Sequence, residues 1–121
     1  MQLTTQDFQP AISIISQGEL LCFATKYNWG GDKRKRIEEI LHNLVIMPID
    51  EESIPNQYAE LMAAGFRAGL NIGQNDLWIA ATSIVYNLIL LTTDKDFSRF
   101  PSPLRYILFD QTSGTTLDER M

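Results

Sequence analysis

The sequence lacks several features that would assign it to well-defined classes of protein. It contains a single cysteine, Cys22, which excludes an internal disulfide and a cysteine-rich zinc site. No apolar run is long enough to span a bilayer, and residues 1–7 lack the basic and apolar regions of a signal peptide. These absences predict a cytoplasmic protein. Because a free cysteine usually behaves as a small hydrophobic residue, Cys22 is predicted to be buried.

Positive charge is also scarce. The 121 residues include 10 Lys and Arg against 15 Asp and Glu, which gives a net charge of −5 at pH 7. Nucleic-acid affinity that rests on bulk electrostatics grows with the number of cationic contacts to phosphates, so this mode of binding is disfavoured. One basic run remains, from Lys33 to Arg36. A solvated helix face and a local RNA-contacting patch are its two interpretations.

The sequence does contain an alternation of short apolar runs and stretches with helical periodicity. Strands are predicted at residues 11–16, 45–49, 88–93 and 104–109. Helices are predicted from about 19 to 27, from about 32 to 44, from 53 to the glycines at 69–73, and from about 75 to 87. With 45% hydrophobic residues, this pattern predicts one α/β domain over residues 1–110, followed by a loose polar tail at 111–121.

Acidic residues stand at the ends of these predicted elements. Glu19 follows the first strand, Asp76 begins a helix, and Asp94 follows the run at 88–93, which is typical of a central parallel strand. Because parallel strands end at one edge of a sheet, we expect these carboxylates to gather there. Each also fits a local role, since Glu19 suits a first helical turn, Asn75 or Asp76 a helix cap and Asp94 a turn.

Three segments contain these acidic residues: Gly18-Glu19-Leu20-Leu21, Asn75-Asp76-Leu77-Trp78-Ile79-Ala80-Ala81 and Thr92-Thr93-Asp94-Lys95-Asp96-Phe97. Together they resemble the PIN domain and, within it, the VapC-type toxins of bacterial toxin–antitoxin pairs. The resemblance runs from about residue 11 to residue 104. It implies a PIN-like α/β fold, in which a parallel sheet is flanked by helices.

The resemblance further implies a metal-dependent endoribonuclease with a cluster of four acidic residues. Glu19, Asp76 and Asp94 match three of them as metal ligands, and Asp96 matches an auxiliary carboxylate. The expected cofactor is Mg²⁺ or Mn²⁺, which prefers oxygen ligands and lowers the pKa of a bound water that attacks phosphorus. The family also implies a homodimer and a cognate antitoxin that inserts a basic side chain among the carboxylates.

One part of the family pattern is not found in this sequence. PIN domains normally begin with a strand that bears the first aspartate, followed by a helix, whereas the only upstream acid here is Asp7 in a polar stretch. We therefore expect that strand, helix and carboxylate to be missing. Residues 106–113, where Asp110 follows an apolar run, are one candidate to take their place. The alternative function is a catalytically silent PIN remnant that serves as a dimerising or partner-binding module.

Overall fold

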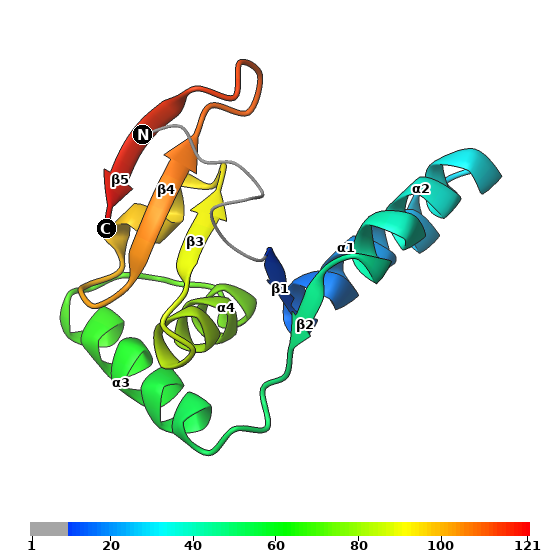
Figure 1. Cartoon of the computed structure of the whole chain (residues 1–121). Helices are drawn as coiled ribbons and strands as arrows, with labels where there is room; N and C mark the ends of the chain where they lie inside the picture. Colours follow the sequence, from blue (N-terminus) through cyan, green and yellow to red (C-terminus); the bar gives the residue numbers. More distant parts are fainter. Residues whose placement is uncertain (1–9) are drawn as a thin grey trace. The chain divides into compact units, whose positions relative to one another are not determined.

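The computed structural model describes residues 10–121, which form two compact units that divide between Pro48 and Ile49 (Figure 1). Asp7, the upstream acid, lies outside the described residues. The first unit contains β1 (Ala11–Ser13), α1 (Ile14–Lys26), α2 (Gly31–His42) and β2 (Val45–Met47). The second contains α3 (Ser53–Arg67), α4 (Gln74–Val85), β3 (Ile89–Thr92), the 3-10 helix η1 (Lys95–Arg99), β4 (Arg105–Phe109) and β5 (Thr116–Arg120).

The alternation of strands and helices confirms the predicted α/β class, and both parallel strand pairs agree with it. In the first unit β1 pairs with β2, with Ala11 opposite Val45. In the second unit β3 pairs with β4, with Ile89 opposite Arg105. None of the helices among residues 10–121 has the length and apolar character needed to cross a membrane.

The first helix begins earlier than predicted, at residue 14 instead of about residue 19. The Ser13 hydroxyl accepts a hydrogen bond from the Ile15 N–H at 3.1 Å and so caps α1, which begins at Ile14. This cap satisfies the Ile15 N–H, which in the predicted strand at residues 11–16 would have donated to a neighbouring strand. The strand is therefore only three residues long. As a result, Glu19 lies in the middle of α1 rather than in its first turn.

The two helices of the first unit are joined by a tight turn at residues 27–30. Asn28 adopts a left-handed conformation with φ of 49°, and the N–H groups of Asn28 and Trp29 donate to the carbonyls of Thr25 and Ala24 at 3.3 and 3.0 Å. This is a Schellman arrangement, in which asparagine replaces the more common glycine. It satisfies the last carbonyls of α1 and fixes the direction in which α2 leaves.

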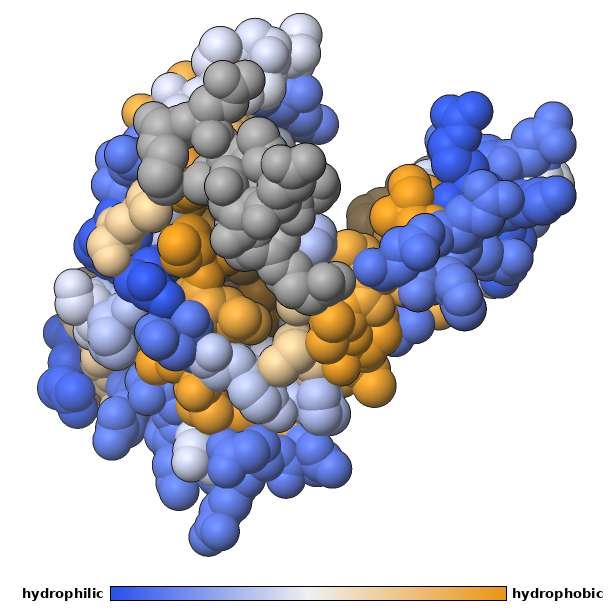
Figure 2. All heavy atoms as spheres, viewed as in Figure 1, coloured by the Kyte–Doolittle hydropathy of each residue, from blue (hydrophilic) through white to orange (hydrophobic). Residues whose placement is uncertain are grey.

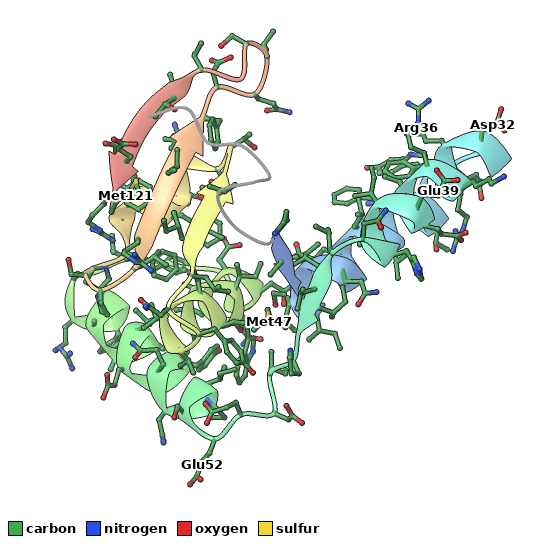
Figure 3. All side chains as sticks on the ribbon, in the orientation of Figure 1. Asp32, Arg36, Glu39, Met47, Glu52 and Met121 are labelled. Carbon is green, nitrogen blue, oxygen red and sulfur yellow. The ribbon has the colours of Figure 1, made fainter. Side chains whose placement is uncertain are left out.

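The surface of the first unit has a polar part on α2, whereas several of its large apolar side chains, among them Phe23 and Ile40, are about half exposed. Figure 2 shows mainly hydrophilic residues on the visible face of α2, and Figure 3 shows Asp32, Arg36 and Glu39 projecting from that helix. Among residues 10–48, only Ala24 and Leu41 are fully buried. Cys22 is exposed, so the prediction of a buried cysteine is wrong. It lies two residues from Ala24, which on a helix places the two side chains on different faces.

The second unit holds the larger core. Its α3 and α4 pack against each other and against the segment after β3. The buried cluster consists of Ile54, Leu61, Leu77, Ala80, Ala81, Phe97, Phe100 and Leu104. Burying a large apolar side chain contributes about 1.5–3 kcal/mol relative to leaving it in water, so this cluster is a major source of the unit's stability.

The C-terminal residues form a strand rather than a loose tail. β5 pairs antiparallel with β4, with Tyr106 opposite Arg120, so the expectation of an unstructured segment at 111–121 is wrong. The Arg120 guanidinium donates to the carbonyls of Leu104 and Phe100 at 2.8 and 2.7 Å, which ties the strand to the core. Among the residues that the structure describes in this sheet, β3 pairs with β4, and β4 lies between β3 and β5.

The buried phenol of Tyr106 links β4 to β5 and makes the stability of the fold pH dependent. Tyr106 donates its hydroxyl proton to Asp118 Oδ2 at 2.7 Å, and this hydrogen bond, together with burial and the negative charge of Asp118, raises the pKa of Tyr106. A raised pKa means that the bond stabilises the fold fully below about pH 10 and is lost as the pH rises through the folded-state value. In a spectrophotometric titration we expect one of the four tyrosines to ionise last. Tyr106→Phe should remove that last step, and a late step that persists in this variant would contradict the assignment.

Candidate functional site

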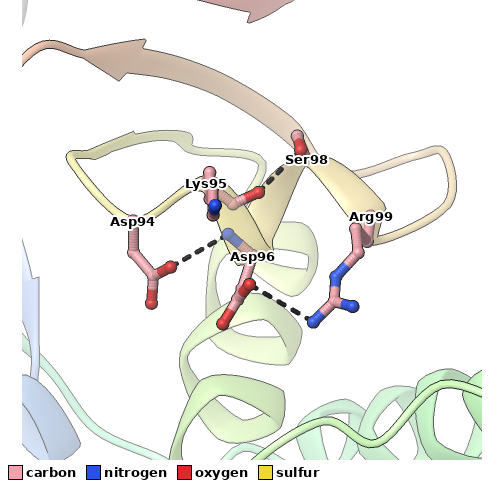
Figure 4. Close-up of polar contacts among 5 residues, drawn as sticks. All are labelled: Asp94, Lys95, Asp96, Ser98 and Arg99. Atoms are coloured by element: carbon pink, nitrogen blue, oxygen red, sulfur yellow. Dashed lines mark hydrogen bonds and ion pairs between the residues drawn. The ribbon is translucent and has the colours of Figure 1, made fainter.

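Two predicted site residues lie in the turn that follows β3. The Asp94 carboxylate caps η1, because its Oδ1 accepts a hydrogen bond from the Asp96 N–H at 2.9 Å (Figure 4). The Asp94 N–H in turn donates to the Thr92 hydroxyl at 3.0 Å. These two bonds hold the Asp94 side chain at the carboxyl end of β3, where the sequence predicts it. Both aspartates are exposed to solvent.

A cation already faces the second of these carboxylates. Arg99 Nη2 lies 3.2 Å from Asp96 Oδ1, and the two side chains are 47% and 50% exposed (Figure 4). Such exposed ion pairs contribute little to stability. This ion pair is not among the contacts predicted from the sequence, although an aspartate and an arginine three residues apart in a short helix are placed to meet.

Asp76 lies at the beginning of α4, but the helix cap is a different residue. The N-cap is Gly73, and α4 begins at Gln74, so the predicted cap at Asn75 or Asp76 is wrong. Asp76 is the third residue of the helix and is only partly exposed, and a Cβ added to Gly73 would lie 3.9 Å from Asp76 Oδ2. The carboxylate is therefore turned back toward the helix N-terminus, where the helix dipole favours negative charge.

Glu19 lies in the first unit, away in sequence from the three aspartates of the second. It is partly exposed, in the central turns of α1. The two units are separate compact bodies, so Glu19 is placed by α1 alone, whereas Asp76, Asp94 and Asp96 share one unit.

Asp110, the candidate for a fourth carboxylate, shapes a turn. Its Oδ1 accepts hydrogen bonds from the N–H groups of Thr112 and Ser113 at 2.9 and 2.8 Å and from the Ser113 hydroxyl at 3.2 Å. These bonds favour the charged form and lower the pKa of Asp110. The residue thus orders the connection between β4 and β5, and β4 itself lies between β3 and β5 as the ordinary continuation of the sheet.

The predicted site residues have suitable chemistry for a divalent cation. Carboxylate oxygens are the ligands that Mg²⁺ and Mn²⁺ prefer. Within residues 10–121, however, no three Asp, Glu, His or Cys side chains lie close enough together to hold a metal ion. Asp94 and Asp96 are brought together in one turn, and their carboxylates each accept a hydrogen bond there. Within the second unit, Asp76, Asp94 and Asp96 therefore do not form a metal centre by themselves.

Comparison with known proteins gives consistent matches. The PIN domain model matches residues 3–103. Ribonuclease VapC4 of Mycobacterium tuberculosis (strain ATCC 25618 / H37Rv) is 25% identical over 96 residues, which cover 78% of this chain and 73% of the relative. Among solved structures, VapBC2 of Rickettsia felis, bound to a DNA fragment from its promoter, matches with a TM-score of 0.76 and 29% identity over 84% of this chain and 76% of the other. VapBC-1 of nontypeable Haemophilus influenzae matches with a TM-score of 0.70 and 25% identity over 83% and 74%.

Proposed function

Because the chain belongs to the PIN domain family, we propose that it is a VapC-type toxin nuclease that hydrolyses phosphodiester bonds in RNA. The observation that carries the proposal is the position of two aspartates within the matched residues. Asp76 stands in the first turn of α4, and Asp94 stands at the carboxyl end of β3. The ribonuclease among the relatives supports RNA as the substrate.

The proposed catalytic residues are Glu19, Asp76 and Asp94, with Asp96 as an auxiliary. A carboxylate beside the scissile bond accepts the proton of a water molecule as that water attacks phosphorus. Carboxylates also repel the phosphate, so cations must stand nearby. Lys95 is exposed beside Asp94, and the Arg99 guanidinium already lies against Asp96. Both are proposed to contact the phosphate, since a guanidinium binds phosphate oxygens well.

A divalent cation, Mg²⁺ or Mn²⁺, is part of this proposal. The family implies one, and the proposed ligands are Glu19, Asp76 and Asp94.

The proposal includes partners and a place of action. The similar solved structures are VapBC proteins, which supports a cognate antitoxin as the partner of this chain. We also propose that the protein is a homodimer and that it acts in the cytoplasm, where RNA is available.

The decisive experiment is incubation of the purified protein with a mixed-sequence RNA. We expect fragments in the presence of Mg²⁺ or Mn²⁺, none in EDTA, and recovery of cleavage when excess Mn²⁺ is added back. Circular dichroism in the same buffers establishes that the protein is folded throughout. A folded protein that cuts no RNA with either cation would overturn the proposal and favour the silent, partner-binding module.

A further inference from the structure

The positive charge of this acidic protein is concentrated in one short segment. Residues 26–36, here called the basic turn, contain five of the ten Lys and Arg and a single acid, Asp32. By contrast, residues 49–121 contain ten Asp and Glu and five Lys and Arg. The basic turn runs from the last residue of α1 into the first half of α2. A polyanion that the chain as a whole repels can therefore be attracted at this segment.

Aromatic rings accompany these cations. Lys33 Nζ lies 4.1 Å from the centroid of the Trp29 ring, and Lys26 Nζ lies 5.5 Å from the centroid of the Tyr27 ring. One face of the Tyr27 ring stacks on Phe23, with the centroids 5.8 Å apart, but Tyr27 is 57% exposed, so part of its ring is accessible to a base. The Schellman turn that ends α1 holds both aromatic residues in place. Aromatic rings beside cations are the features that bind unpaired bases and the phosphates between them.

The stability of the fold does not account for these charges. Cations at the N-terminus of a helix oppose the helix dipole, and the first four N–H groups of α2 have no side-chain cap at Gly30. Arg34 forms an ion pair with Glu38 at 3.5 Å, whereas within residues 10–121 the side chains of Lys35 and Arg36 form none. Arg36 points outward from α2 in Figure 3. A bound phosphate would offset the repulsion that the helix end and these cations otherwise produce.

We infer that the basic turn is a binding surface for single-stranded RNA, made of residues other than the carboxylates proposed to cut it. Lys35 and Arg36 contact phosphates, and Tyr27 stacks on a base. The inference rests on the proposed function, because RNA is the substrate proposed there. It gives this chain a means of holding its substrate despite the net charge of −5.

The test measures binding without cleavage, as fluorescence anisotropy of a labelled single-stranded RNA in EDTA at several salt concentrations. Each phosphate contact contributes about 0.7 to the slope of log affinity against log salt for a single strand. We expect Arg36→Ala to reduce the slope by about 0.7, and the double variant Lys35→Ala/Arg36→Ala to reduce it by about 1.4 and to weaken binding roughly tenfold at low salt. Neither variant should lower the melting temperature.

Arg67→Ala is the matched control, because Arg67 is also an exposed helix arginine but lies in α3. It should leave the slope unchanged. An equal decrease of the salt slope in Arg36→Ala and Arg67→Ala would mean that RNA is bound by bulk electrostatics, and this would overturn the inference. Unchanged RNA affinity in the double variant would also overturn it. Duplex DNA that binds as tightly as the RNA, with the same dependence on Arg36, would overturn the assignment to single-stranded RNA.

The outcome also separates this inference from the proposed nuclease. RNA binding that depends on the basic turn, in a protein that cuts no RNA with Mg²⁺ or Mn²⁺, supports the binding surface and overturns the nuclease. Cleavage that is equally fast in the wild type and the double variant at limiting RNA supports the nuclease and overturns the binding surface.

Discussion

Asp76→Asn is expected to lower the rate of RNA cleavage by about a hundredfold or more, the effect of losing a carboxylate that acts on the reacting groups. The amide is nearly the same size as the carboxylate but has no negative charge and presents one acceptor oxygen instead of two. Asparagine is tolerated in the first turn of a helix, and the lost interaction with the helix dipole is worth only about 0.3–1 kcal/mol. The variant should therefore remain folded.

The matched control for this substitution is Asp50→Asn. Asp50 is an exposed aspartate in the segment before α3, so the change in charge is the same but occurs outside the proposed site. Cleavage rates are compared at equal protein concentration, with thermal melts to establish equal folding. If Asp76→Asn cuts RNA as fast as Asp50→Asn, Asp76 serves α4 alone and the proposed set of carboxylates is wrong.

Local signals in the sequence were sufficient to predict the helices of the second unit. α3 was expected to begin at Ser53 and to end near Gly69, and it spans Ser53–Arg67. The end was predictable because Gly69 adopts φ of 73° and closes the helix, with the Leu70 N–H donating to the Gly65 carbonyl at 2.8 Å. Periodic apolar residues and a glycine stop are both short-range features, which a sequence displays directly.

Competition between equally local signals explains the errors at helix beginnings. The β-branched Ile14 and Ile15 favour a strand, but Ser13 directly before them caps a helix, and both residues are therefore helical. At α4 three residues within one helical turn, Gly73, Asn75 and Asp76, are all acceptable near a helix start, and the chain uses the glycine. Patterns of residue types do not rank such alternatives, because the differences between them are of the order of 1 kcal/mol.

The elements that depend on partners distant in the chain could not be predicted from the sequence. β5 has a polar sequence with no apolar alternation, and it forms because it pairs with β4 and because Arg120 reaches the carbonyls of Phe100 and Leu104. The same reasoning applies to the candidate site. The sequence predicts that Asp94 stands at a strand end, which the structure confirms, but the distances among carboxylates from different elements follow from tertiary packing.

Phe100→Ala is expected to destabilise the second unit by about 3–5 kcal/mol, the usual cost of removing a buried phenyl ring. Phe100 is 1% exposed, and its ring stacks on Phe97 with the centroids 5.5 Å apart. Its carbonyl also accepts the hydrogen bond from Arg120 that secures β5, so a collapse of the backbone into the cavity would loosen that strand as well. Since small proteins have a total stability of only about 5–15 kcal/mol, this loss is a large part of the whole.

Phe66→Ala supplies the matched control, because it removes the same ring from a side chain that is 86% exposed on α3. It should change the free energy of unfolding by no more than about 0.5 kcal/mol. Urea unfolding followed by circular dichroism measures both variants, and hydrogen exchange of the β5 amides shows whether the strand loosens in Phe100→Ala. If the two substitutions shift the unfolding midpoint equally, Phe100 does not belong to the buried cluster of the second unit.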